Sequence, residues 1–432
     1  MKIIKAVCVG AGNRGNIYSN FALTNSERME LIAVVDPNPA RRNELAQKHS
    51  ISSDMRFSNI DEFVARGVKC DLVINATMDN IHYETAKTLL CAGYNVLLEK
   101  PVTNNPYELL DLQKIAKDKG RNLFVCHLMR YTPFYKGIKQ HIINGEIGKI
   151  TSIKLSEYVG VSHFIESFVV GKWRSESGCG SPLLLAKSCH DIDMLCWLNN
   201  STVPKKVASF AARGIFIPEN APDGASDACH TCPHEKTCRY SLTHLFTGMS
   251  GAWKRIMLDF DKPSTAVTQE DIYERLKESH YGKCVYEQKD LVDRQNVIVE
   301  FENGSIGTFD LVGSVAKADR YIHIVGELGE IYGNRSDGFY TVRTYDFVEK
   351  EYVERVYDIS SEIKGGHNGG DIGIMQDVCD YLNGVRTSIS MTGIDDSVNG
   401  HLCVYAAEKS RKNETIEKIC SYNQARVNNL MH

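Results

Sequence analysis

The sequence lacks any hydrophobic run of the roughly 20 residues that a membrane-spanning helix needs. Its first segment, residues 1–7, has too short an apolar stretch for a secretory signal, and Gly10 follows without a cleavage-type segment. These absences exclude a membrane protein and disfavour a secreted one. We therefore expect a cytoplasmic protein with no membrane partner.

An excess of one sign of charge is also lacking. The 50 Lys and Arg residues against 54 Asp and Glu residues leave a net charge of −4, and both signs are mixed along the chain. Nucleic-acid-binding proteins usually carry a basic patch, so we expect no nucleic-acid partner. The 432 residues, 43% of them hydrophobic, are enough for two domains with full-sized cores.

Cysteine, by contrast, is abundant, with 14 residues. Most of them stand alone in apolar surroundings, for example Cys8, Cys126, Cys196 and Cys403. We interpret these as small buried hydrophobic side chains, because free cysteine behaves in this way in protein cores.

The first 130 residues alternate buried strands with helices, and internal repeats are absent. Strands are expected at Ile3–Val9, Leu31–Val35, Asp71–Ala76 and Asn95–Glu99, and helices at Asn16–Asn25, Tyr83–Ala92 and Tyr107–Lys119. Apolar strands separated by helices indicate a parallel sheet covered on both faces. Residues 1–130 are therefore predicted to form an α/β, doubly wound Rossmann domain.

The pattern changes after Arg130. Strands are expected at Ile150–Val159, Val207–Phe216, Asn296–Phe301, Ser305–Val312 and Tyr321–Gly326, and helices at Tyr135–Ile143, Pro182–Leu198, Gly369–Leu382 and Asp395–Lys412. We predict an α+β domain at 131–432 with a large, open, mostly antiparallel sheet. Residues 218–290 interrupt the strands and are interpreted as an insertion with one polar helix, Thr268–Ser279.

A glycine-rich motif follows the first expected strand and opens the first helix. Gly10 permits a tight turn, Gly12 lets a pyrophosphate approach the backbone, and Gly15 lets the helix pack close to the strand. The helix N-terminus, with Asn13 and Arg14, offers N–H groups and a positive dipole end to phosphates. The motif predicts a dinucleotide site.

Asp36 comes directly after the second strand. Its carboxylate can accept hydrogen bonds from both adenosine ribose hydroxyls and would repel a 2′-phosphate, which favours NAD over NADP. Arg41 and Arg42 lie close by and keep NADP open. The alternative is that Asp36 only caps the turn before Pro37.

Glu99, Lys100 and Pro101 end the strand expected before residue 100. Ligands bind at the carboxyl edge of an open parallel sheet, so Lys100 could hydrogen-bond a substrate hydroxyl there while Glu99 orients it or contacts the cofactor. From the pattern alone, a surface lysine at a strand end is an equal alternative.

This triplet and the glycine motif make the chain resemble the Gfo/Idh/MocA oxidoreductases, the family of glucose-fructose oxidoreductase and inositol dehydrogenase. The resemblance covers nearly the whole chain. Residues 76–82 look like the family's turn along the nicotinamide ribose, so Thr77, Asn80 and His82 are implied cofactor contacts together with Glu99 and Lys100. Residues 127–133 look like its domain junction, and residues 189–193 like its catalytic helix.

His190 lies in an apolar helix, where a histidine is more often a core residue. It matches the family's catalytic histidine, however, and Lys187 and Asp193 lie near the same helix face. Many family members carry an aspartate four residues before the histidine, where this chain has Ala186. Lys187 beside it would suit an acidic substrate or could transfer the proton itself, so Lys187 joins Lys100 and His190 as a predicted catalytic residue.

Substrate contacts are expected before and along this helix. Trp173 could stack on a pyranose face and Arg174 could bind hydroxyls, with His163 close in sequence; the alternative is packing and a surface salt bridge. The resemblance adds Arg130 and Asp191 to the implied substrate contacts.

The insertion carries a group of cysteines. Cys229, Cys232 and Cys238 have the spacing C-x2-C-x5-C, and two thiolates three positions apart can hold one tetrahedral ion. Cys284 is the expected fourth ligand, with His230 and His234 as competitors. We predict a structural zinc site; an iron–sulfur centre and free thiols are the alternatives.

Three functions fit these features. The first is an NAD-dependent dehydrogenase of a sugar, polyol or sugar acid, in which Lys100 and His190 handle the hydroxyl proton during hydride transfer. The second is an NAD-dependent glycosidase that works by transient oxidation and elimination without net cofactor turnover. The third is a non-catalytic NAD sensor. The resemblance also implies a homodimer or homotetramer formed through the second-domain sheet.

Overall fold

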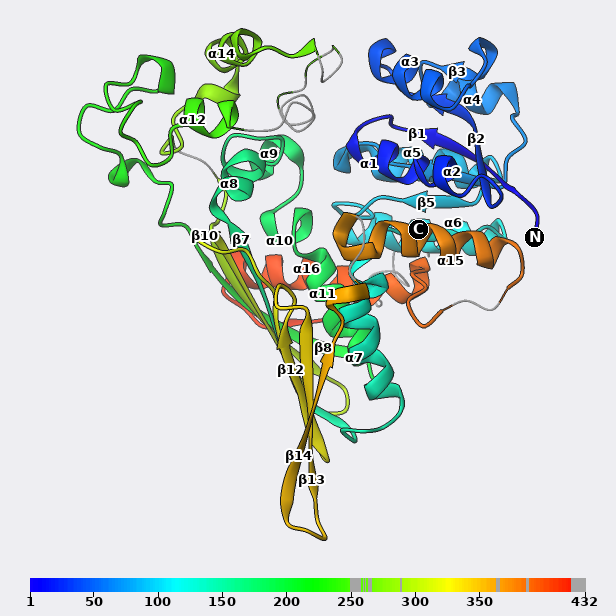
Figure 1. Ribbon diagram of the computed structural model, residues 1–432, viewed down its shortest axis with the longest axis vertical. Coiled ribbons are helices and arrows are strands. Elements are labelled where there is room, and N and C mark those ends of the chain that lie inside the picture. Colours follow the sequence, from blue (N-terminus) through cyan, green and yellow to red (C-terminus); the bar gives the residue numbers. More distant parts are fainter. Residues whose placement is uncertain are drawn as a thin grey trace.

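Two sheets organise the chain (Figure 1). The computed structural model describes residues 1–248, 258, 260, 262, 266–287, 290–362, 366–385 and 388–420. Part of the predicted insertion at 218–290 lies outside these residues. No described helix is both long and apolar enough to cross a membrane.

The first sheet is parallel and has the order β3-β2-β1-β4-β5-β6. Its strands are β1 Ile4–Val9, β2 Met29–Val35, β3 Arg56–Phe57, β4 Leu72–Asn75, β5 Val96–Leu98 and β6 Leu123–Val125. Its helices are α1 Asn13–Ser19, α2 Phe21–Thr24, α3 Pro39–Lys48, α4 Ile60–Arg66, α5 His82–Cys91 and α6 Pro106–Asp118. The predicted Rossmann fold is confirmed. The strand order reverses between β1 and β4, which is where such sheets bind ligands.

The second sheet has nine strands in the order β14-β13-β12-β11-β7-β10-β9-β8-β15. All pairs are antiparallel except β7 with β10. Its strands are β7 Ile150–Gly160, β8 Pro204–Ala212, β9 Arg294–Phe301, β10 Ile306–Val315, β11 Tyr321–Gly326, β12 Gly329–Asn334, β13 Phe339–Asp346, β14 Glu351–Asp358 and β15 Glu417–Lys418. The predicted open, mostly antiparallel sheet is confirmed and is larger than expected.

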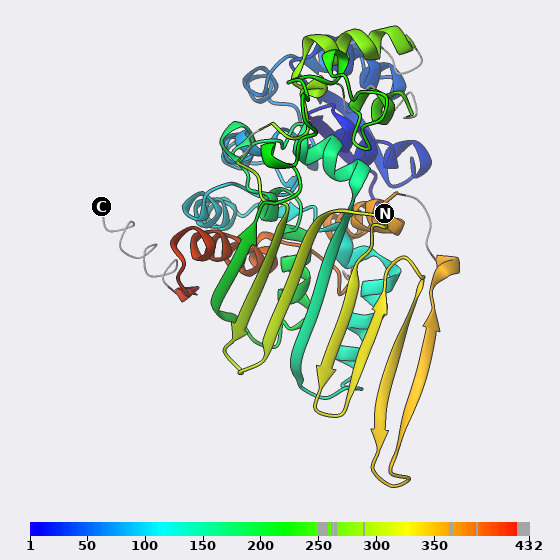
Figure 2. The same cartoon turned by 90° about the vertical axis from the view of Figure 1, so that its left-hand side faces the viewer.

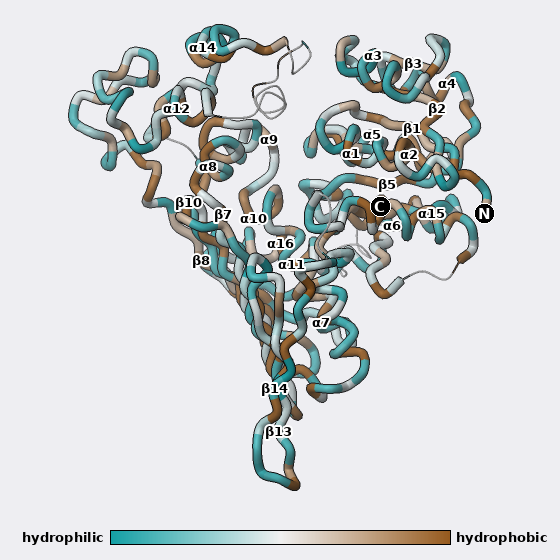
Figure 3. The backbone as a smooth tube through the Cα atoms, in the orientation of Figure 1, coloured by the Kyte–Doolittle hydropathy of each residue, from teal (hydrophilic) through white to brown (hydrophobic). Residues whose placement is uncertain are grey.

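Helices cover one face of this sheet. Figure 2 looks onto the other face, which no helix of the described chain covers. The helices of this part are α7 Pro133–Ile143, α8 Val161–Phe164, α9 Glu176–Cys179, α10 Leu183–Ala186, α11 Cys189–Leu198, α12 Leu242–Thr247, α14 Gln269–Glu278, α15 Gly370–Leu382 and α16 Ile394–Asn413. Helix α14, in the insertion, is mostly hydrophilic (Figure 3) and buries only Ile272 and Leu276.

Three predicted elements differ from the observed ones. The helix expected at Asn16–Asn25 is divided at Asn20 into α1 and α2. The single helix expected at Pro182–Leu198 is broken between α10 and α11, and the break at Lys187 and Ser188 frees the carbonyl of Ala186 from the helix ladder. The strand expected at Val207–Phe216 ends at Ala212. There the carboxylate of Asp293 accepts hydrogen bonds from two successive backbone N–H groups, of Gly214 and Ile215, and turns the chain.

Helix α15 returns from the second domain to the first sheet. Its residues Ile374, Met375 and Val378 are buried in the same apolar cluster as Ala6 and Cys8 of β1. The predicted boundary assigns this helix to residues 131–432, although its apolar face packs against the Rossmann core. This return brings the residues just before α15 next to the glycine motif.

Candidate active site

The three glycines of the motif have three different surroundings. Gly10 has φ +89°, and a Cβ there would lie 2.5 Å from the carbonyl oxygen of Ala76. A Cβ on Gly15 would lie 2.0 Å from the carbonyl oxygen of Gly10, whereas nothing lies within 4 Å of one on Gly12. The first and third glycines are therefore required by packing, and the second keeps a space open in front of the backbone.

Asp36 lies beside this loop and is 5% exposed. Its Oδ2 accepts a hydrogen bond from the Ala11 N–H (2.7 Å) and its Oδ1 from the Asn38 N–H (2.8 Å). The carboxylate thus ties two turns together, as the capping alternative required. A carboxylate has about four acceptor positions, so it can also accept from ribose hydroxyls. The loop and the acid therefore fit NAD.

Arg14 points away from the open side of the loop. Its Nε lies 2.6 Å from Glu99 Oε1 and its Nη2 lies 2.8 Å from Asp371 Oδ1. Burial raises the pKa of Glu99, but the neighbouring Arg14 and Lys100 outweigh it, so the pKa is lowered and the carboxylate stays ionised. If Arg14 contacts the cofactor, as predicted, it does so through its backbone N–H. Glu99 orients the Arg14 side chain and accepts a hydrogen bond from the Lys100 backbone N–H.

The turn after β4 holds the three other predicted cofactor contacts. Thr77 Oγ1 donates to Asn75 Oδ1 (2.9 Å), and Asn80 is exposed on the turn. His82 is 1% exposed, with Nδ1 2.6 Å from Pro101 O and Nε2 3.1 Å from Thr77 O. The His82 ring is therefore buried between two protein carbonyls, and the cofactor contact at His82 stays a prediction.

Lys100 follows β5 and His190 lies on α11, and the charge of Lys100 reaches the His190 ring. Lys100 Nζ donates to the carbonyl oxygen of Ala186 (2.6 Å). The helix break described above makes this carbonyl available, and carbonyls at a helix C-terminus attract cations. A backbone oxygen thus holds the lysine at Ala186, the position where the resemblance implied an aspartate.

His190 is half-buried, and its Nδ1 has no hydrogen-bond partner in the described structure. Burial lowers the pKa of His190 well below its usual value, and the charge of Lys100 lowers it further, so the ring is neutral at pH 7. His127 packs edge-on against it, with ring centroids 5.7 Å apart. Asp193, near the same helix face in the sequence, pairs instead with Arg130.

The partner of Asp193 is Arg130. Arg130 Nε lies 2.7 Å from Asp193 Oδ2 and its Nη2 lies 2.5 Å from Oδ1, and Arg130 is 2% exposed. Its Nη2 also donates to the Asp396 carbonyl. This forked pair occupies the guanidinium, which contradicts the expectation that Arg130 binds substrate.

Lys187 belongs to a second buried charge group. Its Nζ lies 3.1 Å from Glu157 Oε1, while Arg320 Nε lies 2.5 Å from Glu157 Oε2 and 2.7 Å from Asp191 Oδ1. Burial raises the pKa of Glu157, but Arg320 and Lys187 outweigh it and lower the pKa. Two cations and two carboxylates form this group, so neither the predicted proton transfer by Lys187 nor the predicted substrate contact of Asp191 has a free charge to use.

The other expected substrate contacts surround this group. Trp173 Nε1 donates to Asp79 Oδ2 (3.0 Å) and thereby ties the second domain to the turn after β4. Arg174 Nη1 donates to the Gly171 carbonyl (3.3 Å). His163 is exposed, yet burial of its ring and the charge of Lys187 lower the pKa of His163 to about 3. Of these three side chains, His163 is the one within electrostatic reach of Lys100.

The cysteines of the insertion converge, but not on a metal site. Cys229, Cys232, Cys238 and Cys284 line one narrow pocket together with His234. No group of three potential ligands within the described ranges is arranged to hold an ion. The structure therefore does not support the predicted zinc, although it brings Cys284 to the other three as expected.

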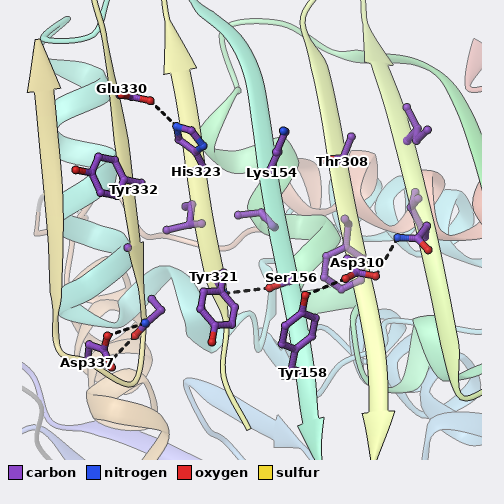
Figure 4. Close-up of a pocket in the computed structure, with 18 of the residues that line it drawn as sticks. Lys154, Ser156, Tyr158, Thr308, Asp310, Tyr321, His323, Glu330, Tyr332 and Asp337 are labelled. Atoms are coloured by element: carbon purple, nitrogen blue, oxygen red, sulfur yellow. Dashed lines mark hydrogen bonds and ion pairs between the residues drawn. The ribbon is translucent and has the colours of Figure 1, made fainter. Parts of the chain in front are cut away.

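The sheet face away from the helices carries a hollow of about 950 Å³ (Figure 4). Tyr158 donates to Asp310 Oδ2 (3.1 Å) on one side of it, and His323 Nε2 lies 2.6 Å from Glu330 Oε2 on the other. The hollow lies on the opposite side of the sheet from α10 and α11, which carry the catalytic candidates.

Comparison with known proteins decides the family. Residues 4–127 match the model of the oxidoreductase family with an NAD-binding Rossmann fold, and residues 139–419 match its C-terminal alpha/beta domain. The chain belongs to the Gfo/Idh/MocA oxidoreductase family. It is an oxidoreductase with an NAD-binding Rossmann domain, as the sequence predicted.

Relatives agree with this membership. YteT of Bacillus subtilis (strain 168), named as an oxidoreductase, is 24% identical over 369 residues, which are 82% of each chain. D-xylose dehydrogenase of Paenarthrobacter nicotinovorans is 27% identical over 135 residues, 31% of this chain and 34% of that protein. The structure of levoglucosan dehydrogenase in complex with NADH superposes with a TM-score of 0.70 at 16% identity, covering 97% of this chain and 99% of that one.

Sequence reasoning missed several residues at the Gfo/Idh/MocA site. Glu157 on β7 and Arg320, directly before β11, are far apart in sequence and meet only in the folded protein. His367 and Asp371 contact Arg14 of the glycine motif. The sequence offered one indication of them, a histidine between two pairs of glycines that is followed by an acid. His127 lies within the segment 127–133, which is predicted to form the domain junction, but it was given no role of its own.

The glycine surroundings predict two separable effects. Gly12→Ala should leave the free energy of unfolding unchanged but weaken NADH binding by about 10- to 100-fold, because its methyl group fills the open space. Gly15→Ala should destabilise the fold by about 1–3 kcal/mol. Fluorescence titration with NADH and urea unfolding measure both effects. Equal NADH affinity in Gly12→Ala and the native protein would contradict the assignment.

The buried Arg130 pair predicts a loss of stability. Arg130→Met should lower the free energy of unfolding by about 3–5 kcal/mol, because it leaves the carboxylate of Asp193 buried and unpaired. The double variant Arg130→Met/Asp193→Leu should recover much of this loss. Urea unfolding of both variants tests this expectation. A raised KM with unchanged stability would instead restore a substrate role to Arg130.

Buried histidines predict weaker stability in acid. Burial lowers the pKa values of His127, His190 and His401, so below about pH 6.5 the unfolded chain binds protons that the native state does not. The free energy of unfolding should therefore fall from pH 8 to pH 5. His127→Gln should show a shallower fall in urea titrations at the two pH values. An identical slope would exclude His127 as a contributor.

Proposed function

We propose that this protein is an NAD-dependent dehydrogenase of a sugar or polyol, and that Lys100 and His190 handle the proton of the reacting hydroxyl. The observation that carries the proposal is the contact between Lys100 and the carbonyl of Ala186, four residues before His190. It brings a cation and a neutral imidazole together at the carboxyl edge of the parallel sheet, beside the glycine loop.

The chemistry follows from the charge state of each group. The neutral His190 can accept the hydroxyl proton, and the Lys100 ammonium can stabilise the developing alkoxide, which makes that proton easier to remove. NAD, when bound, supplies the acceptor for the hydride that leaves the carbon. The alcohol thus loses a proton to His190 and a hydride to the cofactor, and a carbonyl compound results.

The choice of NAD over NADP rests on Asp36. Its carboxylate is held beside the glycine loop by the N–H groups of Ala11 and Asn38. A 2′-phosphate would bring a second negative charge against this buried carboxylate. Arg42, which could have bound such a phosphate, instead donates to the Asp36 carbonyl oxygen (2.5 Å).

The charge balance supports a neutral substrate. Lys187 and Arg320 are each paired with a carboxylate of Glu157 or Asp191, so they offer no net positive charge to a sugar acid. His163 and Trp173 remain the proposed contacts of a polyhydroxylated ligand. A hydroxyl-rich neutral sugar or polyol is therefore favoured over the acidic sugars that Lys187 suggested.

The redox-cycling glycosidase loses its main support. That alternative rested on the missing aspartate at Ala186 and on the insertion at 218–290, and the carbonyl of Ala186 holds Lys100 without an aspartate. Glycoside cleavage is therefore kept as one outcome of the test below.

A homodimer through the open sheet face is part of the proposal. Ile298, Tyr321 and Phe339 line the hollow of Figure 4 and are each at least 43% exposed. Exposed apolar surface of this extent on a sheet is typical of an interface. This face is distant from the glycine loop, so pairing would leave the proposed site open.

We expect the purified protein to reduce NAD with at least one member of a panel of neutral sugars and polyols. Lys100→Met should lower kcat/KM by about 10²- to 10⁴-fold and retain NADH binding, because the lost group acts on the hydroxyl. Lys114→Met, at an exposed lysine paired with Asp118, is the matched control. The assay follows absorbance of NADH and product formation together.

Each other outcome has a distinct meaning. Cleavage of aryl glycosides without NADH accumulation would identify the glycosidase. Retained activity in Lys100→Met would overturn the proposed role of the lysine. NADH binding without turnover of any alcohol or glycoside would favour a sensor.

A further inference from the structure

The turn that precedes helix α15 has an unusual backbone. His367 has φ 47° and Asn368 has φ 55°, and Gly369 follows with φ 90°. Left-handed conformations cost roughly 1–2 kcal/mol for each residue other than glycine, and such strain collects at binding and catalytic sites. Two successive non-glycine residues with this backbone therefore indicate that the turn holds a functional side chain in place.

It presents an imidazole with a fixed orientation. His367 Nδ1 lies 2.9 Å from Asp371 Oδ2, one turn of chain further on. Burial raises the pKa of Asp371, but the hydrogen bond from His367 and the charge of Arg14 outweigh it, so the pKa is lowered and the group is a carboxylate. A carboxylate only accepts hydrogen bonds, so Nδ1 carries the hydrogen and Nε2 carries the lone pair.

Arg14 fixes the same carboxylate from the other side. Its Nη2 lies 2.8 Å from Asp371 Oδ1, and its Nη1 lies 3.3 Å from His367 Nδ1. Arg14 Nη1 and His367 Nδ1 both carry hydrogen, so this second contact is close packing of two donors and not a hydrogen bond. The imidazole is thus held between the glycine loop and α15, with Nε2 on the side away from Asp371.

The position of His367 relates it to the catalytic candidates. Arg14 also pairs with Glu99, whose carboxylate accepts from the Lys100 N–H (2.9 Å). Protonation of His367 would lower the pKa of His190, so the two rings lie within electrostatic reach of each other. The His367 side chain is 54% exposed, and its Nε2 makes no hydrogen bond in the described part of the chain.

We propose that His367 Nε2 hydrogen-bonds a second hydroxyl of the substrate, close to the one that Lys100 and His190 act on, and that Asp371 is its positioning residue. This inference rests on the proposed dehydrogenase function and adds a specificity contact to it. An Asp–His pair of this kind suits a neutral polyol, because Nε2 can accept a hydroxyl proton and becomes a donor only when protonated.

The test uses the full-length protein and two substitutions in the same turn. His367→Asn keeps a side chain that tolerates a left-handed backbone but removes Nε2. Asn368→Gly is the matched control, since it relaxes the next left-handed residue and leaves the imidazole in place. For each variant we would measure the thermal midpoint, the NADH dissociation constant by fluorescence, and KM and kcat with the alcohol that the native protein oxidises.

We expect His367→Asn to keep the thermal midpoint and NADH affinity and to lose about tenfold in kcat/KM, the usual effect of one hydrogen bond. Monodeoxy analogues of the substrate then locate the partner. With the native protein and with Asn368→Gly, one analogue should show a kcat/KM about tenfold lower than the full substrate. With His367→Asn the same analogue and the full substrate should have similar kcat/KM values, because removing the hydroxyl and removing the imidazole delete the same contact.

The remaining outcomes are separable. If His367→Asn weakens NADH binding as much as it lowers kcat/KM, the ring contacts the cofactor and the proposal is wrong. If the variant matches the native protein with every analogue, His367 only holds the turn. If the native protein oxidises no alcohol, the dehydrogenase function itself has failed, independently of His367.

Discussion

Arg14 is the residue on which the geometry of the site depends. Its guanidinium joins the glycine loop to Glu99, directly after β5, and to Asp371 on α15, three segments that are far apart in sequence. All three side chains are largely buried, and a buried charge is tolerated only when it is paired and hydrogen-bonded. The pairing therefore fixes β5, with Lys100 at its end, relative to the turn that carries His367.

A second constraint is that the other buried charges near the site balance each other. Glu157, Lys187, Arg320 and Asp191 balance each other, and Arg130 balances Asp193. Lys100, by contrast, is held by a carbonyl and not by a carboxylate, so its charge remains available for a ligand. The site is thereby suited to stabilising one developing negative charge, which is what removal of a hydroxyl proton requires.

Local patterns predicted the fold well. Apolar strands between helices gave the Rossmann sheet, and period-two alternation gave the strands of the open sheet, because both patterns depend on neighbouring residues alone. The break between α10 and α11 was not predictable, since residues 182–198 form an apolar stretch that is typical of one continuous helix. The break is stabilised by a contact with Lys100, more than 80 residues away.

The sequence by itself determined the nucleotide-binding motif and the family, and it indicated Lys100 and His190 as catalytic candidates, because each depends on residues close together in the chain. It could not determine which charges are free. Arg130, Lys187 and Asp191 have the chemistry of ligand-binding residues, yet Asp193, Glu157 and Arg320 occupy them. Pairing depends on which side chains meet across sheets and helices, and only the tertiary structure decides that, as it decided the position of His367 beside Arg14.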